Sequence, residues 1–226
     1  MKSKCLSWIL LVLLFLPELS SAEEKKYRFG DIKEENGFLV FNFQVRDLLD
    51  KGVLKGLQKG MTAAIEYQVQ LWRERPHWVN QLVAEQIVRM KVSFDNWEKR
   101  YAVVTRDEEP RLLNEDRVRE QCSELTNFRV APLSKLEEES KYTITVKVVM
   151  QPMSMESYQE IKRWLAGEVK ELNPKAIKST KSPGRKAGDW LVGLVLNLTG
   201  FGDRVITAKA PAFHWKEGSF ILEEGR

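Results

Sequence analysis

The chain carries few side chains that do chemistry on their own. It has two histidines, His77 and His214, and two cysteines, Cys5 and Cys122. A structural zinc site takes four cysteine or histidine ligands at short spacings, and these four residues stand far apart. Patterns for zinc proteases, nucleophile elbows and phosphate loops do not occur. The sequence therefore predicts no metal and no cofactor, and favours a protein without enzymatic activity. A hydrolase whose catalytic residues meet only in the folded chain stays open as an alternative.

Two acidic runs, 107–109 and 137–139, could supply the paired carboxylates of a glycosidase. Adjacent acids are usually solvated, so we interpret both runs as exposed loops. Cys122 shares one face of an expected helix with Val118 and Leu125. This spacing favours a small buried side chain over a reactive thiol.

An aromatic and basic segment at 71–78 contains Trp72, Arg73, Arg75 and Trp78. Trp72 falls on the polar positions of its expected strand. An exposed tryptophan beside arginines can bind a planar or anionic partner by stacking and charge. The alternative is that Trp72 covers a second apolar layer beneath a helix. Both interpretations stay open.

A second candidate contact joins a basic loop to an apolar segment. The loop, which we expect to be flexible, spans 173–189, and Trp190 begins a run of apolar residues at helical spacing through 201. Such a combination can lie on an anionic membrane surface, or it can be a core helix that follows a solvated loop. The cations of this candidate are Lys175, Lys178, Lys181, Arg185 and Lys186.

These candidates must be positioned by strands, because period-two alternation of apolar and polar residues dominates the chain. Alternation places one face of a strand on a core and the other in water, which favours antiparallel sheet. Asn36-Gly37 supplies a hairpin turn. We expect strands at 27–32, 38–46, 62–71, 86–94, 99–106, 127–133, 141–150 and 204–210, and a turn or short helix at 76–82.

Three helices are expected between the strands. Asp47 can cap one that runs through Leu57, Asn114 can cap 115–125, and Ser154 can cap 155–166. The fold class is thus mainly β with helices (α+β): a single domain built as an antiparallel β-sandwich or strongly curved sheet of about seven or eight strands. The expected core contains Phe41, Phe43, Ile65, Tyr67, Val69, Val88, Val92, Ile144, Val146 and Val148.

Residues 1–22 have the three parts of a secretory signal peptide. Lys2 and Lys4 form a positive head, 6–16 is an apolar run, and Ala22 is the small residue at the expected cleavage point. A stable membrane-spanning helix needs roughly 20 apolar residues, which is more than this run offers. We expect cleavage after Ala22, a mature domain over 23–226, and a periplasmic or secreted location. The net charge of +4 is too weak to indicate nucleic-acid binding.

Several core and turn segments form a recognisable set: Gly56–Gly60 leading into Ile65–Leu71, Leu71–Arg73 with Trp78, Val92–Asp95 with Tyr101, Tyr142, Trp164–Gly167 and Gly200–Asp203. Together they resemble the bacterial family catalogued as domain of unknown function 4390. The resemblance implies an exported protein of one β-rich domain with no established activity and no defined catalytic residues. Members encoded near envelope-facing sensor kinases suggest a signalling or accessory role.

The sequence favours a non-enzymatic envelope or periplasmic binding or accessory module, whose partner is an envelope protein or a membrane surface. Two alternatives stay open. A peripheral membrane or lipid-binding protein predicts an apolar cavity beside 190–201. An envelope hydrolase with dispersed catalytic residues predicts His77 or His214 in a cleft beside a carboxylate or hydroxyl.

Overall fold

The computed structural model describes residues 26–106, 108–153, 163–168, 203–216 and 219–223. The expected signal peptide, the basic loop and most of the helix expected after Ser154 lie outside these ranges. The elements are β1 (Tyr27–Glu35), β2 (Phe38–Val45), α2 (Lys51–Gln58), β3 (Thr62–Arg73), β4 (Gln81–Asp95), β5 (Arg100–Val104), β6 (Arg111–Leu113), α3 (Glu115–Ser123), β7 (Glu124–Pro132), the 3-10 turn η1 (Leu133–Lys135), β8 (Lys141–Met153), β9 (Arg204–Lys209), β10 (Phe213–Lys216) and β11 (Ser219–Leu222).

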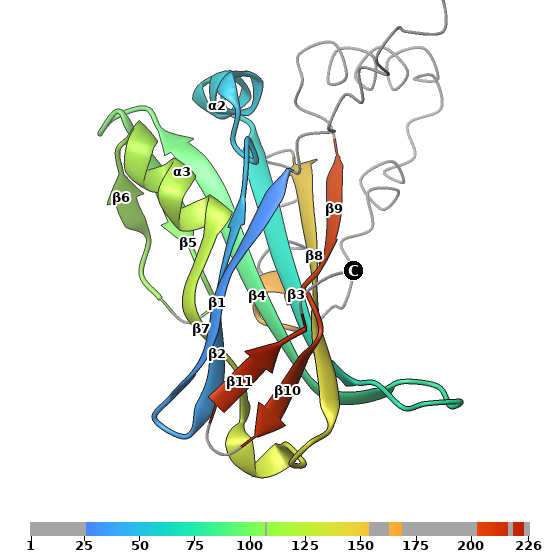
Figure 1. The fold of residues 1–226 in the computed structure, drawn as a ribbon. Helices are drawn as coiled ribbons and strands as arrows, with labels where there is room; N and C mark the ends of the chain where they lie inside the picture. The colour runs from blue at the N-terminus through green and yellow to red at the C-terminus, as the bar shows by residue number, and fades with distance from the viewer. Residues whose placement is uncertain (1–25, 107, 154–162, 169–202, 217–218, 224–226) are drawn as a thin grey trace, which may run out of the picture.

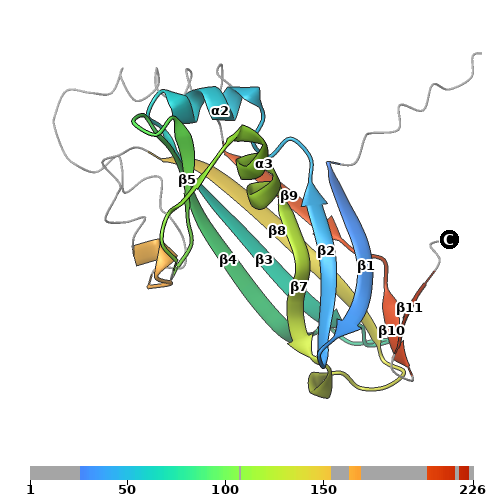
Figure 2. The same ribbon diagram turned by 90° about the vertical axis from the view of Figure 1, so that its left-hand side faces the viewer.

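The described strands form two antiparallel sheets. A small sheet has the order β1-β2-β7, and a large sheet has the order β11-β10-β8-β3-β4-β5-β6, with β9 also paired to β8. The small sheet lies over one face of the large sheet, and α2 and α3 lie at one end of the pair (Figure 1, Figure 2). The prediction of a mainly antiparallel, sandwich-like single domain with a few helices is confirmed.

The core between the sheets follows from the alternation. On β3, Ile65, Tyr67, Val69 and Leu71 have no exposed surface and share one cluster with the inward side chains of β2 and β8. Of the ten residues expected in the core, nine are buried, and Val88 is partly buried against them. Removing apolar area from water at about 25 cal/mol per Å² is the main force that holds the sheets together.

One buried hydrogen bond links the large sheet to the layer above it. The Tyr67 hydroxyl donates to the Cys122 carbonyl oxygen at 2.6 Å. Val118 and Cys122 are fully buried on α3, as expected, whereas Leu125 lies beyond the helix, at the start of β7, and is buried there. A buried carbonyl left without a donor costs free energy, and this hydroxyl satisfies it.

The structure corrects the start of the first helix. Asp50, not Asp47, is the N-cap of α2, and its side chain accepts a hydrogen bond from the Val53 amide at 2.9 Å. Asp47 instead adopts a left-handed backbone conformation with φ 54°, in a turn that places Leu48 and Leu49 in the core. The apolar run before α2 is therefore buried as a turn, which a helical spacing argument does not distinguish from a first helical turn.

Several strand boundaries also differ from expectation. β4 begins at Gln81 rather than 86, because Val83 is an extra residue between the pairs Leu71↔Ala84 and Trp72↔Leu82. Such a bulge breaks the period-two pattern that sequence analysis depends on. β1 and β8 are longer than expected, β5 and α3 are shorter, and β7 begins and ends earlier. The short strands β6, β10 and β11 were not predicted, since three or four residues are too few for a clear alternation.

The predicted hairpin turn at Asn36-Gly37 is confirmed. Asn36 and Gly37 both have positive φ, at 53° and 78°, as a two-residue hairpin turn requires. The Asp95 carboxylate accepts hydrogen bonds from the amides of Trp97 and Glu98 at 2.8 and 3.1 Å, which stabilises the turn between β4 and β5. Within the described ranges, no helix has the length and apolar character needed to cross a membrane.

Asp50→Ala should lower the free energy of unfolding by about 1–2 kcal/mol, because it removes the cap of α2 and the ion pair with Arg204 at 2.6 Å. Burial acts to raise the pKa of the Asp50 carboxyl, but hydrogen bonds from Val53 and Arg204 outweigh burial and lower it. The contribution is therefore present at neutral pH and lost as the pH falls through the folded-state pKa. Urea melts at pH 7 and pH 3 measure both effects.

Asp47→Asn is the control for this prediction, since asparagine tolerates positive φ. An equal loss of stability for both variants would contradict the assignment of Asp50 as the cap.

Tyr67→Phe should cost about 1–2 kcal/mol, because it leaves the Cys122 carbonyl without its donor in the core. Tyr101→Phe is the matched control: its hydroxyl accepts from Gln58, an exposed side chain, at 2.8 Å, and water can replace that contact. In thermal melts, Tyr67→Phe should have a clearly lower melting temperature than Tyr101→Phe. Equal melting temperatures would show that the Tyr67 hydrogen bond contributes nothing specific to stability.

Candidate binding face of the large sheet

The face of the large sheet that points away from the small sheet carries the candidate site. The alternation that buries Tyr67 places the residues between the buried positions of β3, among them Glu66, Gln68 and Trp72, on this outward face. Two open hollows lie side by side on it, of about 520 and 480 Å³, and both are lined by Gln68 and Lys147. We call this surface, from Trp72 to Trp164, the outer face.

The first hollow lies beneath the β3–β4 hairpin and has Trp72 as its aromatic wall. Trp72 is half-buried, and its indole N–H donates to the Thr145 hydroxyl at 3.2 Å, which fixes the plane of the ring. Val79, from the turn of the hairpin, and the exposed Lys147 and Lys209 complete the hollow. An aromatic surface with two cations in the same hollow suits a partner with a flat or apolar part and a negative group.

The second hollow is closed at one end by Trp164. This side chain is 3% exposed and packs on Ala64. The Arg89 guanidinium lies 5.4 Å from the centre of the Trp164 ring and donates to Glu66 at 2.8 Å. Ile87 and Val205 line the same hollow and are largely exposed. The hollow is therefore partly apolar, and its Arg89 and Glu66 side chains are already paired with each other.

Between the hollows, side-chain amides are held in fixed positions. Gln68 and Gln70 each donate to the same Glu85 carboxylate oxygen at 2.7 Å. One carboxylate that accepts two amides keeps both side chains flat against the sheet. The arrangement presents hydrogen-bonding groups and aromatic rings along neighbouring strands, which suits recognition of an extended partner more than proton transfer.

The structure brings together only part of the aromatic and basic segment. Arg73 and Arg75 both donate to the Gln81 side-chain oxygen. Trp72 lies on the outer face, whereas Arg73 points to the opposite side, where it contacts Glu137 and is 15% exposed. Arg75 and Trp78 lie on the exposed turn of the hairpin, and Trp78 is 80% exposed. The alternation of β3 separates Trp72 from Arg73. The other expected contacts, Lys175, Lys178, Lys181, Arg185, Lys186 and Trp190, lie outside the described residues.

Other residues of the outer face were not predicted. Thr145 and Lys147 lie on the polar positions of β8, so the alternation could have indicated them once β8 was known to neighbour β3. Trp164 lies within the helix expected at 155–166, but a helical spacing did not indicate that its side chain packs on the large sheet. Its burial depends on Ala64, whose small side chain leaves room for an indole on the sheet.

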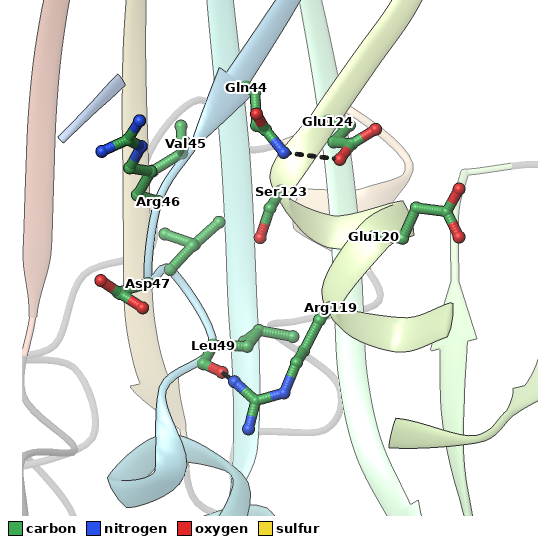
Figure 3. A pocket seen from close by; sticks show the side chains of 10 residues that line it. Gln44, Val45, Arg46, Asp47, Leu49, Arg119, Glu120, Ser123 and Glu124 are labelled. Atoms are coloured by element: carbon green, nitrogen blue, oxygen red, sulfur yellow. Dashed lines mark hydrogen bonds between the residues drawn. The ribbon is translucent and has the colours of Figure 1, made fainter. Parts of the chain in front are cut away.

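A third hollow, of about 370 Å³, lies where the end of β2 meets α3 (Figure 3). Its polar groups are already paired with one another. Gln44 donates to Glu124 at 2.8 Å, and Arg119 donates to the Leu49 carbonyl oxygen. We interpret this hollow as the seam between a helix and a strand end rather than as a binding site.

The two histidines lie apart from the outer face. His77 is on the exposed hairpin turn with φ 64°. His214, on β10, lies 3.0 Å from the Glu223 carboxylate. Neither lines one of the three hollows described above. In the described part of the chain, no group of three or more His, Cys, Asp or Glu residues is placed to hold a metal.

The family comparison gives one match. A family model described as "Domain of unknown function (DUF4390)" matches residues 27–158, which span β1 to β8 and hence most of the outer face. No curated protein and no solved structure matches the chain.

Cys122 should be unreactive in the folded protein. Burial raises the pKa of its thiol to about 12, so the nucleophilic thiolate is scarce at pH 8. With residues 1–22 removed, which takes away Cys5, we expect thiol reagents to label the chain only in denaturant. Rapid labelling of the native protein at pH 8 would contradict the buried position.

Proposed function

This chain belongs to the DUF4390 family, and we propose that it is a non-enzymatic binding or accessory module of the bacterial envelope that holds a partner protein on its outer face. The proposed location rests on the features of a cleavable signal in residues 1–22. The proposed partner is an envelope protein, and an extended segment of it would lie along β3 and β8.

The observation that supports this function best is the pair of adjoining hollows. Together they form one surface with Trp72 near one end and Trp164 at the other, and Lys147 lines both. The half-buried Trp72 ring gives a partner apolar contact area at low entropic cost, and the buried Trp164 shapes the far end of the surface. The neighbouring glutamines and lysines supply hydrogen bonds and charge, which set orientation and specificity.

The outer face is not a continuous apolar surface. Glu66, Glu85, Arg89 and Lys147 are interspersed with the apolar side chains, so the surface is compatible with water when no partner is bound. This mixture is typical of interfaces that form and dissociate. The hydrolase alternative receives no comparable support, because His77 and His214 lie outside the hollows of this face.

Site-directed cross-linking tests the proposed face. Thr207 is exposed and lines the hollow beside Trp72, so Thr207→Cys can carry a photoactivatable thiol reagent, while the buried Cys122 stays unlabelled. We expect Thr207→Cys to capture a discrete envelope protein in cells. A probe at Thr126→Cys, exposed on β7 of the small sheet, should capture none of it.

A charge reversal decides whether the capture is specific. Adding Lys147→Glu to Thr207→Cys should lower the yield about five-fold, since it reverses a charge at the centre of the surface. Lys55→Glu, an exposed site on α2, is the matched control and should leave the yield unchanged. Capture at both cysteine positions, or capture insensitive to Lys147→Glu, would exclude the outer face as the binding surface.

A further inference from the structure

The hairpin that joins β3 to β4 projects beyond the rest of the large sheet. Figure 1 shows it extending to the lower right, away from the small sheet. The bulge at Val83 gives this arm its own bend, because an extra residue on one strand increases the local twist. At its base the Glu74 amide donates to the Lys141 carbonyl at 2.8 Å, and at its turn the Trp78 amide donates to the Arg75 carbonyl at 3.2 Å.

The turn of this hairpin exposes large apolar side chains. Trp78 is 80% exposed and Val79 is 86% exposed, and Leu82 follows on β4 with 42%. We call residues 75–82 the apex. Water around so much apolar surface is unfavourable, and exposed apolar residues grouped at one point mark a contact site more often than single ones do.

The charge of the apex is one-sided. Residues 75–84 include Arg75 and contain no aspartate or glutamate. The nearest carboxylate before them, Glu74, is engaged by Lys141 at 3.4 Å and Lys209 at 3.7 Å. A tryptophan beside a cation, with the adjacent acid already paired to lysines, is a composition that favours the headgroup region of an anionic membrane.

We propose that the apex inserts Trp78 and Val79 into the surface of an anionic lipid bilayer, with Arg75 at the level of the lipid phosphates. The apex adjoins the partner surface proposed above, because Val79 also lines the hollow beside Trp72, whereas Trp78 and Arg75 line neither hollow of the outer face. A convex, narrow apex needs a cavity in a protein partner, but a bilayer interface yields around it. The insertion would hold the large sheet end-on to the membrane and leave its outer face open at the side.

Vesicle co-sedimentation tests the proposal. The protein without residues 1–22, which retains every described element, is mixed at low salt with vesicles of phosphatidylethanolamine and phosphatidylglycerol, and with neutral phosphatidylcholine vesicles. Trp78→Ser should lower partitioning into the anionic vesicles about ten-fold. Arg75→Gln should lower it about five-fold there and have little effect on the neutral vesicles.

Trp97 provides a matched control. It is 95% exposed in the turn at the other end of β4, about 50 Å away at 3.3 Å per residue, and Trp97→Ser should leave partitioning unchanged. Thermal melts confirm that the variants fold, which is expected for exposed positions. The proposal is overturned if the parent protein does not sediment with anionic vesicles, if Trp78→Ser sediments as well as the parent, or if Trp97→Ser loses as much. Loss of cross-linked partner in Trp78→Ser without any vesicle effect would assign the apex to a protein contact instead.

Discussion

The strict alternation of β3 is the constraint on which the rest of the structure depends. β3 lies in the middle of the large sheet, paired to β4 on one side and β8 on the other. Its alternation therefore determines which face of the sheet packs in the core and which faces outward. One face commits Ile65, Tyr67, Val69 and Leu71 to the core. The Tyr67 hydroxyl then fixes the opposite layer through Cys122. Because a one-residue slip would exchange the faces, the same pattern determines the core and the outer face together.

Most of the fold could be predicted because its signals are local. Alternation in β2, β3 and β8, the Asn36-Gly37 turn and the cap at Asn114 each act within a few residues, and the structure agrees with all of them. The errors occur where tertiary structure overrides local pattern. At Asp47 the chain bends to bury Leu48 and Leu49 before the helix begins, and at Val83 a bulge shifts the register. Neither the turn nor the bulge has a periodicity that could reveal it.

The candidate site was less predictable, since it is assembled across strands. Trp72 was singled out from composition and parity, and it does lie on the outer face. Its neighbours there come from β8, β9 and the hairpin turn, and the pairing of these strands is not encoded in any short segment. Conversely, Arg73 and Trp72 are adjacent in sequence but face opposite sides of the sheet. Proximity along a strand is therefore a poor guide to a shared surface, whereas equal parity on paired strands is a good one.

The pairing of β8 with β9 has a consequence for the length of the connection between them. Its two ends are fixed beside each other, because Met150 pairs with Arg204, and Arg204 also binds the Asp47 carbonyl oxygen and the Asp50 carboxylate. When the ends of a segment are held together in this way, the entropic cost of closing the loop rises by only about 0.6 kcal/mol for each doubling of the loop length. The family match ends at 158, inside this same connection. A longer or shorter connection between β8 and β9 would therefore change the stability of the sheet little, as long as the pairing of Met150 with Arg204 is kept.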